Sequence, residues 1–409
     1  MAAGERFELM PANTPSQPTT WLIHVAFVLT GIMTTLLDPL LPVLSARWKM
    51  SDAQAGHLFT AQFLGSMLGV ALSGGLVRKF GYRTAMATAL GVLATGAIAM
   101  GATLKLPSTW TMAIVTVSAY GIGLGLTMPT ANLLIAELNP MRRAAALSWL
   151  NFSWGVGAAV CPFAVALLVA VREVHLLLFA VAVPLLVLCL WLTRPSMPFP
   201  KVFRKELTSA TTSGVWRSPL AFALGALFYL YVGTENCVGG WVASYAQRMH
   251  PVRGTFWAVT PAFFWMALLA GRALAPGLLR YVEETALAKS GLLVAFTGLV
   301  GLVSAHSVRV LLTSAAVIGL GLAPVFPVNI ALLSRRFGKL TPNLGSVMFA
   351  LAGLGGATMP SLVGTVSTRF GGLKAGLYLP LAGCATMLVL YVGTARSLKA
   401  KSGPVPEEI

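Results

Sequence analysis

Three ionisable side chains, Asp38, Glu235 and Arg272, lie deep inside long apolar segments of this chain. If these segments cross a bilayer, a charged group there costs several kcal/mol unless it is paired or faces water. A carboxyl group shielded from water also binds a proton more readily than a solvated one, so it can load and release protons near neutral pH. Asp38 and Glu235 are therefore candidates for proton coupling, with Arg272 as a counter-ion.

Each of these residues also has a structural interpretation. Asp38 precedes Pro39, and proline leaves backbone carbonyls free, which is tolerated beside a cavity or a neighbouring helix. Its carboxyl group either carries a proton or is a hydrogen-bonded structural group. Glu235 either contacts substrate hydroxyls or pairs with Arg272. Arg272 either accepts that pairing or extends toward the membrane surface.

Amide and aromatic side chains in the same segments suit a neutral, polyhydroxylated substrate. Amides hydrogen-bond hydroxyl groups, and an indole ring stacks on the apolar face of a sugar. An asparagine can instead bond a neighbouring helix, and a tryptophan can anchor a helix at the membrane interface. The substrate-binding candidates, in addition to Glu235, are Gln62, Asn132, Asn151, Trp154, Asn236, Trp241, Trp265 and Asn329.

The composition requires most of the protein surface to face lipid. Of the 409 residues, 56% are hydrophobic and only 10% are charged, whereas soluble chains carry about 25% charged residues. The net charge of +17 would suggest nucleic-acid binding in a soluble protein. Here the basic residues lie in short loops between apolar segments, so we expect no nucleic-acid partner.

No pattern in the sequence predicts an enzyme or a cofactor. The four cysteines lie inside apolar segments without metal-ligand spacing, and no Walker-type loop is present. We find no arrangement of nucleophile and base that would support catalysis. We therefore expect no metal, no cofactor and no use of ATP, with a proton gradient as the energy source.

The apolar segments predict an all-α membrane protein with twelve transmembrane helices, since a span needs roughly 20 apolar residues. The longest polar break lies near the midpoint, so we expect two six-helix bundles. The predicted organisation is a cytoplasmic tail (1–20), a first bundle (21–193), a cytoplasmic linker (194–217), a second bundle (218–395) and a cytoplasmic tail (396–409). Lys and Arg are about twice as frequent in the loops that this topology places inside. We expect a bacterial inner-membrane location.

Glycine, proline and arginine positions recur between the two predicted bundles. Parallel six-helix repeats of this kind carry the substrate near the midplane of the membrane, between the halves. The recurring pairs include Gly121 and Gly319, Gly123 and Gly321, Pro129 and Pro327, Gly157 and Gly355, Pro162 and Pro360, and, at a slightly different offset, Arg78 and Arg280.

The stretch from Gly74 to Arg83 resembles the loop motif of the major facilitator superfamily. The resemblance implies a two-bundle transporter, monomeric, that exposes its site to either side in turn. Arg78 stands where the family has an aspartate that caps a helix and ties to an arginine. We therefore expect the inner gate to be held differently, by Glu137 with Arg83 or Arg142. Gly74, Arg78, Gly81, Arg83, Glu137 and Arg142 are the gating and structural candidates.

The segment from Tyr231 to Tyr245 resembles the helix-7 pattern of the fucose/proton symporter family and its sugar-transporting relatives. Gly271-Arg272 and Asn132 are also similar to that group, although Met128 stands where fucose-type members carry an acid. The resemblance implies proton-coupled symport of a neutral, hexose-type sugar, with a proton-binding aspartate in the first helix. The alternative is proton-driven efflux of a drug-like or other small amphipathic compound, which would favour a cavity with fewer amides.

Overall fold

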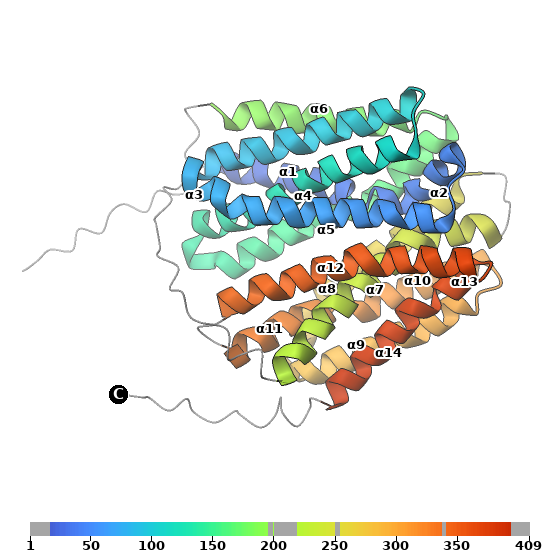
Figure 1. The fold of residues 1–409 in the computed structure, drawn as a ribbon. Helices are drawn as coiled ribbons and strands as arrows, with labels where there is room; N and C mark the ends of the chain where they lie inside the picture. Colours follow the sequence, from blue (N-terminus) through green and yellow to red (C-terminus); the bar gives the residue numbers. More distant parts are fainter. Residues whose placement is uncertain (1–16, 195–198, 200–218, 250–253, 338–340, 394–409) are drawn as a thin grey trace, which may run out of the picture.

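The computed structural model describes residues 17–194, 199, 219–249, 254–337 and 341–393, and these residues form helices and no strands. Most of the predicted tails and linker (1–20, 194–217 and 396–409) lies outside the described residues. The helices (Figure 1) are α1 (Gln17–Thr35), α2 (Leu37–Trp48), α3 (Asp52–Lys105), α4 (Trp110–Leu138), η1 (Pro140–Arg142), α5 (Arg143–Ala170), α6 (His175–Leu192), α7 (Pro219–Met249), η3 (Phe256–Val259), α8 (Thr260–Leu278), α9 (Glu284–Val303), α10 (Val308–Leu322), α11 (Val325–Phe337), α12 (Thr341–Arg369), α13 (Leu373–Gly376) and α14 (Tyr378–Gly393).

By length and composition, ten helical stretches can each cross a membrane. The pair α1 and α2, bent by 42° at their junction, adds one broken span. Helix α3 has 54 residues and is two helices joined at Gly81, whose φ of 80° is not helical and suits glycine. Counted this way, the described part of the chain holds the twelve spans that the sequence predicts.

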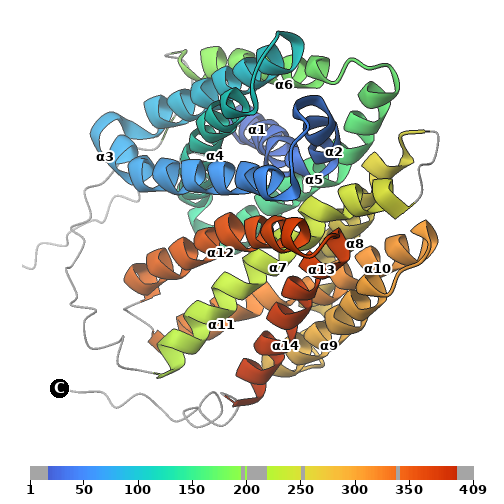
Figure 2. The same ribbon diagram turned by 45° about the vertical axis from the view of Figure 1, so that its right-hand side comes forward.

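The helices form two groups that follow the order of the chain. In Figures 1 and 2 the blue-to-green helices α1 to α6 lie together, and the yellow-to-red helices α7 to α14 lie beside them as a second group. The main contacts between the groups join α3 to α12, α5 to α8 and α2 to α7. The site described below lies along these contacts.

The sequence repeat is a repeat of helix–helix contacts. A Cβ atom on Gly121 of α4 would collide with the backbone oxygen of Gln62 on α3, and one on Gly319 of α10 would collide with that of Phe264 on α8. Such glycines let helix backbones approach closely in a membrane, where packing replaces the hydrophobic effect. Two more glycine pairs repeat in this way. Gly123 packs against Leu93 in the first group, as Gly321 packs against Ala295 in the second. Gly157 packs against Val28 in the first group, as Gly355 packs against Tyr229 in the second.

The two groups meet tightly at the end of the molecule where α3 begins, which we call the closed end. Asp52, the first residue of α3, accepts a hydrogen bond of 2.7 Å from Arg248 at the end of α7 and another from Ser367 of α12. About two helical turns beyond, Thr60 donates to the backbone oxygen of Ala357 at 2.6 Å. Three helices from both groups are thus joined here.

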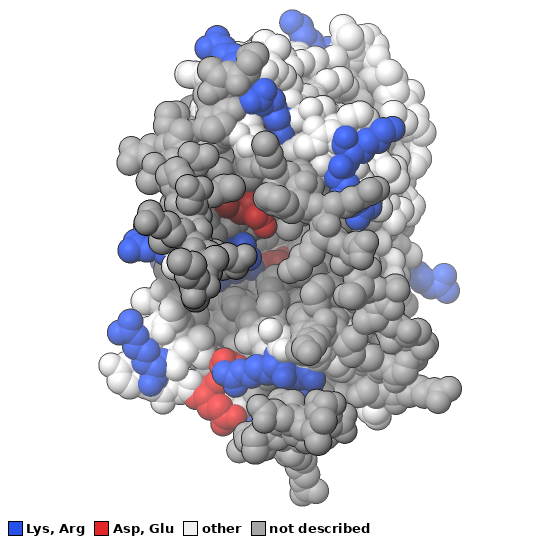
Figure 3. Space-filling model, turned by 90° about the vertical axis from the view of Figure 1, so that its left-hand side faces the viewer, with Lys and Arg blue, Asp and Glu red and all other residues white. Residues whose placement is uncertain are grey.

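The groups separate toward the opposite end, which we call the open end. A Cβ atom on Gly353 of α12 would lie 3.0 Å from Cγ of Met67 on α3. Beyond it Leu68, Leu72 and Phe349 are about half exposed. Figure 3 views this end and shows acidic and basic side chains near its middle. Among the described residues, the side chains of the two groups are thus packed together at the closed end and more exposed toward the open end.

Candidate functional site

Asp38 lies where the first span breaks between α1 and α2. It is only 3% exposed, and its Oδ2 accepts a hydrogen bond of 2.8 Å from Nε1 of Trp265. Trp265 belongs to α8, so this bond joins the two helix groups. Among the described residues no basic side chain forms an ion pair with Asp38. The carboxyl group is therefore buried with a neutral donor as its hydrogen-bond partner.

A glycine on α7 makes room for this bond. A Cβ atom on Gly239 would lie 3.0 Å from Oδ2 of Asp38 and 3.0 Å from the ring of Trp265. Because a larger residue would press on both partners, the close approach of α2, α7 and α8 favours glycine here. Phe264 packs edge-on against Trp265 at 5.0 Å between ring centroids, which fixes the indole further.

Glu235 lies one helical turn from Gly239 on the same helix and has a charged partner. Its Oε1 lies 3.0 Å from Nη2 of Arg272 on α8, which confirms the predicted ion pair. Tyr231, one turn earlier on α7, donates to the same carboxylate oxygen at 3.1 Å and accepts from Arg272 at 3.2 Å. The three side chains form a closed network within the second group of helices.

Trp154 extends the site into the first group of helices. Its ring meets Trp265 edge-to-face at 5.7 Å between centroids, and its Nε1 donates to Oγ1 of Thr34 at 3.3 Å. Thr34 lies one turn before Asp38. Direct contacts thus link the two indoles and the carboxyl group from α5 across α1 and α2 to α8, with Asp38 and Trp265 both buried.

Three of the predicted asparagines keep a polar atom available to a ligand. The side-chain nitrogens of Asn132, Asn151 and Asn236 each donate to the backbone oxygen four residues earlier, at 2.7 to 2.8 Å. All three residues are at least partly exposed, and their side-chain oxygens have no donor among the described residues. Each of these side-chain oxygens can therefore accept a hydrogen bond from a substrate hydroxyl group.

The other three predicted contacts are bonded within the protein in this state. Gln62 donates to the backbone oxygen of Thr34 and accepts from Tyr120. Trp241 is fully buried and donates to the backbone oxygen of Pro360 at 3.0 Å. Asn329 is fully buried too and accepts from Tyr391 of α14. Gln62 and Trp241 would bind substrate only if their present bonds were exchanged, whereas Nδ2 of Asn329 has no hydrogen-bond partner among the described residues.

The comparisons with known proteins agree with this architecture. The family model of the Major Facilitator Superfamily matches residues 23–341. The chain belongs to the major facilitator superfamily. It is therefore a membrane transporter and not an enzyme.

Curated relatives in the superfamily carry different substrates. A niacin transporter of Acinetobacter baylyi is 30% identical over 155 residues, which are 37% of this chain and 34% of that protein. A glucose/galactose transporter of Brucella abortus is 25% identical over 90% of this chain and 92% of that protein. The chain thus spans about a third of the first relative and almost all of the second.

Solved superfamily structures share the fold at low identity. A bacterial homologue of the human lysosomal transporter Spinster, described as inward-facing, has a TM-score of 0.77 and 15% identity over 96% of this chain and 100% of that one. The fucose:proton symporter of E. coli has a TM-score of 0.63 and 19% identity, over 92% of this chain and 98% of that one.

The superfamily's loop motif lies at the open end. Gly81 provides the turn between the two parts of α3, and Gly74 has open space around it. Arg78, at the position of the family's aspartate, is exposed. Arg83, at the end of the motif, lies 5.4 Å from the centroid of the Phe199 ring.

The expectation that Glu137 pairs with Arg83 or Arg142 is wrong in this state. Glu137 lies 4.0 Å from Arg143, and both side chains are about half exposed. The reason is the turn Pro140–Arg142, which reverses the chain after α4 and brings the first residue of α5 back beside Glu137. An exposed pair of this kind contributes little stability.

Sequence reasoning missed three residues of the site and its surroundings. Thr34 and Gly239 act through their position beside Asp38, and small residues in membrane helices are too common to single out. Tyr231 carried a usable signal, because it precedes Glu235 by four residues and such residues lie on one helix face. The pairing of Asp52 with Arg248 joins residues far apart in the chain.

Proposed function

We propose that this chain is a proton-coupled symporter of a neutral, hexose-type sugar in the bacterial inner membrane. Asp38 carries the proton, and Glu235 with Arg272 forms part of the sugar site. The termini are cytoplasmic, so the open end faces the cytoplasm and the described state is inward-open. The protein works as a monomer without a cofactor, and the proton gradient supplies the energy.

The observation that carries this proposal is the different pairing of the two buried acids. Neutralising Glu235 would leave Arg272 as an unpaired cation inside the membrane, which is costly. Protonating Asp38 leaves no charge behind, because its partner Trp265 is neutral. Asp38 is thus the acid that can change its charge during a transport cycle.

The position of Asp38 also supports coupling to a change of shape. An indole N–H bonds a carboxylate more strongly than a neutral carboxyl group. Protonation therefore weakens one of the bonds that join the two helix groups. A sugar that binds between the groups replaces that bond with its own contacts, so the groups can rearrange when both ligands are present.

The chemistry of the surrounding side chains favours a sugar. Trp154, which is partly exposed, offers an apolar ring, and the asparagine oxygens can accept hydroxyl donors. The similarity to a glucose/galactose transporter over most of both chains supports the same substrate class. An efflux carrier of apolar cations would gain little from this amide set.

The test is uptake by proteoliposomes that contain the purified protein. Labelled glucose, galactose and fucose are offered with and without an inward proton gradient, beside nicotinate and a cationic dye. We expect a hexose to accumulate only with the gradient. Extrusion of the dye without sugar uptake would establish the antiport alternative, and uptake of nicotinate alone would replace the substrate class.

A further inference from the structure

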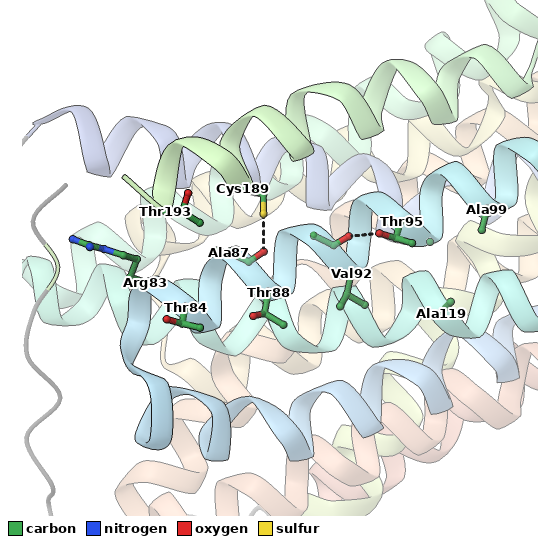
Figure 4. A pocket seen from close by; sticks show the side chains of 12 residues that line it. Arg83, Thr84, Ala87, Thr88, Val92, Thr95, Ala99, Ala119, Cys189 and Thr193 are labelled. Carbon is green, nitrogen blue, oxygen red and sulfur yellow. Dashed lines mark hydrogen bonds between the residues drawn. The ribbon is translucent and has the colours of Figure 1, made fainter. Parts of the chain in front are cut away.

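A cavity of about 670 Å³ lies away from the proposed transport site, between the second part of α3, α4 and α6. Its lining includes Arg83 and Thr84 near the Gly81 turn, then Gly91 and Ala99 further along α3, with Cys189 on α6 (Figure 4). The sixteen residue-to-residue steps from Arg83 to Ala99 correspond to about 24 Å of helix. The groove therefore extends most of the way across a hydrocarbon core of about 30 Å.

The groove opens on a surface that faces lipid. On α6, which forms one of its walls, Val183, Val187 and Leu190 are each at least half exposed. On α3 the residues toward the groove are small, so the wall recedes between the larger side chains. The long, narrow shape and the apolar rim match an acyl chain of the bilayer.

The hydrogen-bonded and the unbonded hydroxyl groups of the groove lie at different depths. Deeper in, Thr95 donates to the backbone oxygen of Gly91 at 2.8 Å, so its hydroxyl is already bonded. Near the mouth, the exposed hydroxyls of Thr84 and Thr88 have no hydrogen-bond partner among the described residues, and they lie one turn apart beside Arg83. Unbonded hydroxyls are costly in a lipid environment unless a ligand satisfies them.

Because the unbonded hydroxyls and the basic side chain lie together at the mouth of an apolar groove, we propose that the groove binds an anionic phospholipid. The headgroup phosphate lies at the mouth, where Arg83 supplies a positive charge and the two threonines supply donors. One acyl chain lies along α3 toward Ala99, between α3 and α6. The positive charge of Arg83 at the mouth favours an anionic headgroup. The length of the groove matches an acyl chain, which indicates a lipid as the ligand. This site does not depend on which substrate the protein transports.

The headgroup is tested by native mass spectrometry on the full-length, delipidated protein. Phosphatidylglycerol and phosphatidylcholine with identical acyl chains are titrated in turn. We expect tighter binding of phosphatidylglycerol, and Arg83→Gln should weaken it about fivefold, the effect of one basic side chain on an anionic lipid. The control Arg280→Gln makes the same charge change on an exposed residue of the other helix group and should leave binding unchanged.

The groove is tested separately by filling it. Thr95→Trp should reduce retention of both lipids, while Thr297→Trp, at an equally exposed threonine of α9, should not. Thermal denaturation of each variant checks that it is folded. Equal binding of the two lipids by the unmodified protein, equal losses in Arg83→Gln and Arg280→Gln, or full retention in Thr95→Trp would each overturn the proposal.

Discussion

Asp38 in the first span and Glu235 in α7 are both buried acids, yet their partners differ in kind. Glu235 belongs to a network with Arg272 and Tyr231 on neighbouring helices of its own group. Asp38 has a neutral partner, Trp265, which belongs to the opposite group. One half of the molecule thus holds a buried ion pair, and the other holds a buried acid with a neutral partner.

The charge of the partner indicates which of the two acids can be protonated and deprotonated during transport. A paired acid gains its stability from the opposite charge, so a proton on it disrupts the pair. A single acid bonded to a neutral donor disturbs only that bond. In the proposed mechanism, Asp38 is therefore the proton site and Glu235 belongs to the substrate site.

The largest expected effect separates the two acids by transport. In proteoliposomes, Asp38→Asn should reduce gradient-driven sugar accumulation to the background of empty vesicles, because the amide cannot carry the proton. Exchange of labelled for unlabelled sugar without a gradient should continue. Accumulation at the unmodified level would remove Asp38 from the coupling mechanism.

The second effect separates them by stability. Glu235→Gln strands the Arg272 charge, so we expect destabilisation of about 3 kcal/mol, measured by thermal denaturation in detergent. Asp38→Asn should cost less than about 1 kcal/mol, since a neutral amide can still accept from an indole.

The double variant Glu235→Gln/Arg272→Gln provides the control, because it removes both charges together. It should recover most of the stability that the single variant loses. A double variant as unstable as the single one would show that the ion pair is not what Glu235 contributes.

A smaller effect tests the bond between the halves. Trp265→Phe keeps an aromatic ring but removes the donor to Asp38, and a hydrogen bond to a charged group contributes about 1.5 to 3 kcal/mol. We expect about a tenfold fall in the ratio of sugar accumulated with and without the gradient. Trp154→Phe loses a bond to Thr34 instead and should leave that ratio unchanged.

The smallest effect concerns the closed end. Asp52→Asn removes an ion pair with Arg248, whose side chain is 43% exposed, so the loss is about 1 kcal/mol or less. We expect up to about a fivefold shift in population away from the described state, read from spin-label distances between α3 and α12. Glu284→Gln breaks a pair with Arg335 inside one helix group and should produce no shift.

The sequence alone was sufficient to predict the membrane spans, the internal repeat and the candidate site residues. The length of an apolar segment and its number of charged residues are local properties of the sequence, so the twelve spans could be predicted without knowledge of the fold. Asp38, Glu235 and Arg272 stood out because a membrane segment tolerates few ionisable groups. The ion pair between Glu235 and Arg272 was also predictable, since few opposite charges were available.

Only the tertiary structure decided how these groups are partnered. Asp38 and Trp265 are 227 positions apart, and no sequence pattern links an aspartate to a particular indole. Arg143 replaces the predicted partners of Glu137 because one turn of the chain changes which arginine faces it. The open and closed ends depend on contacts between the two helix groups, which a linear pattern does not contain.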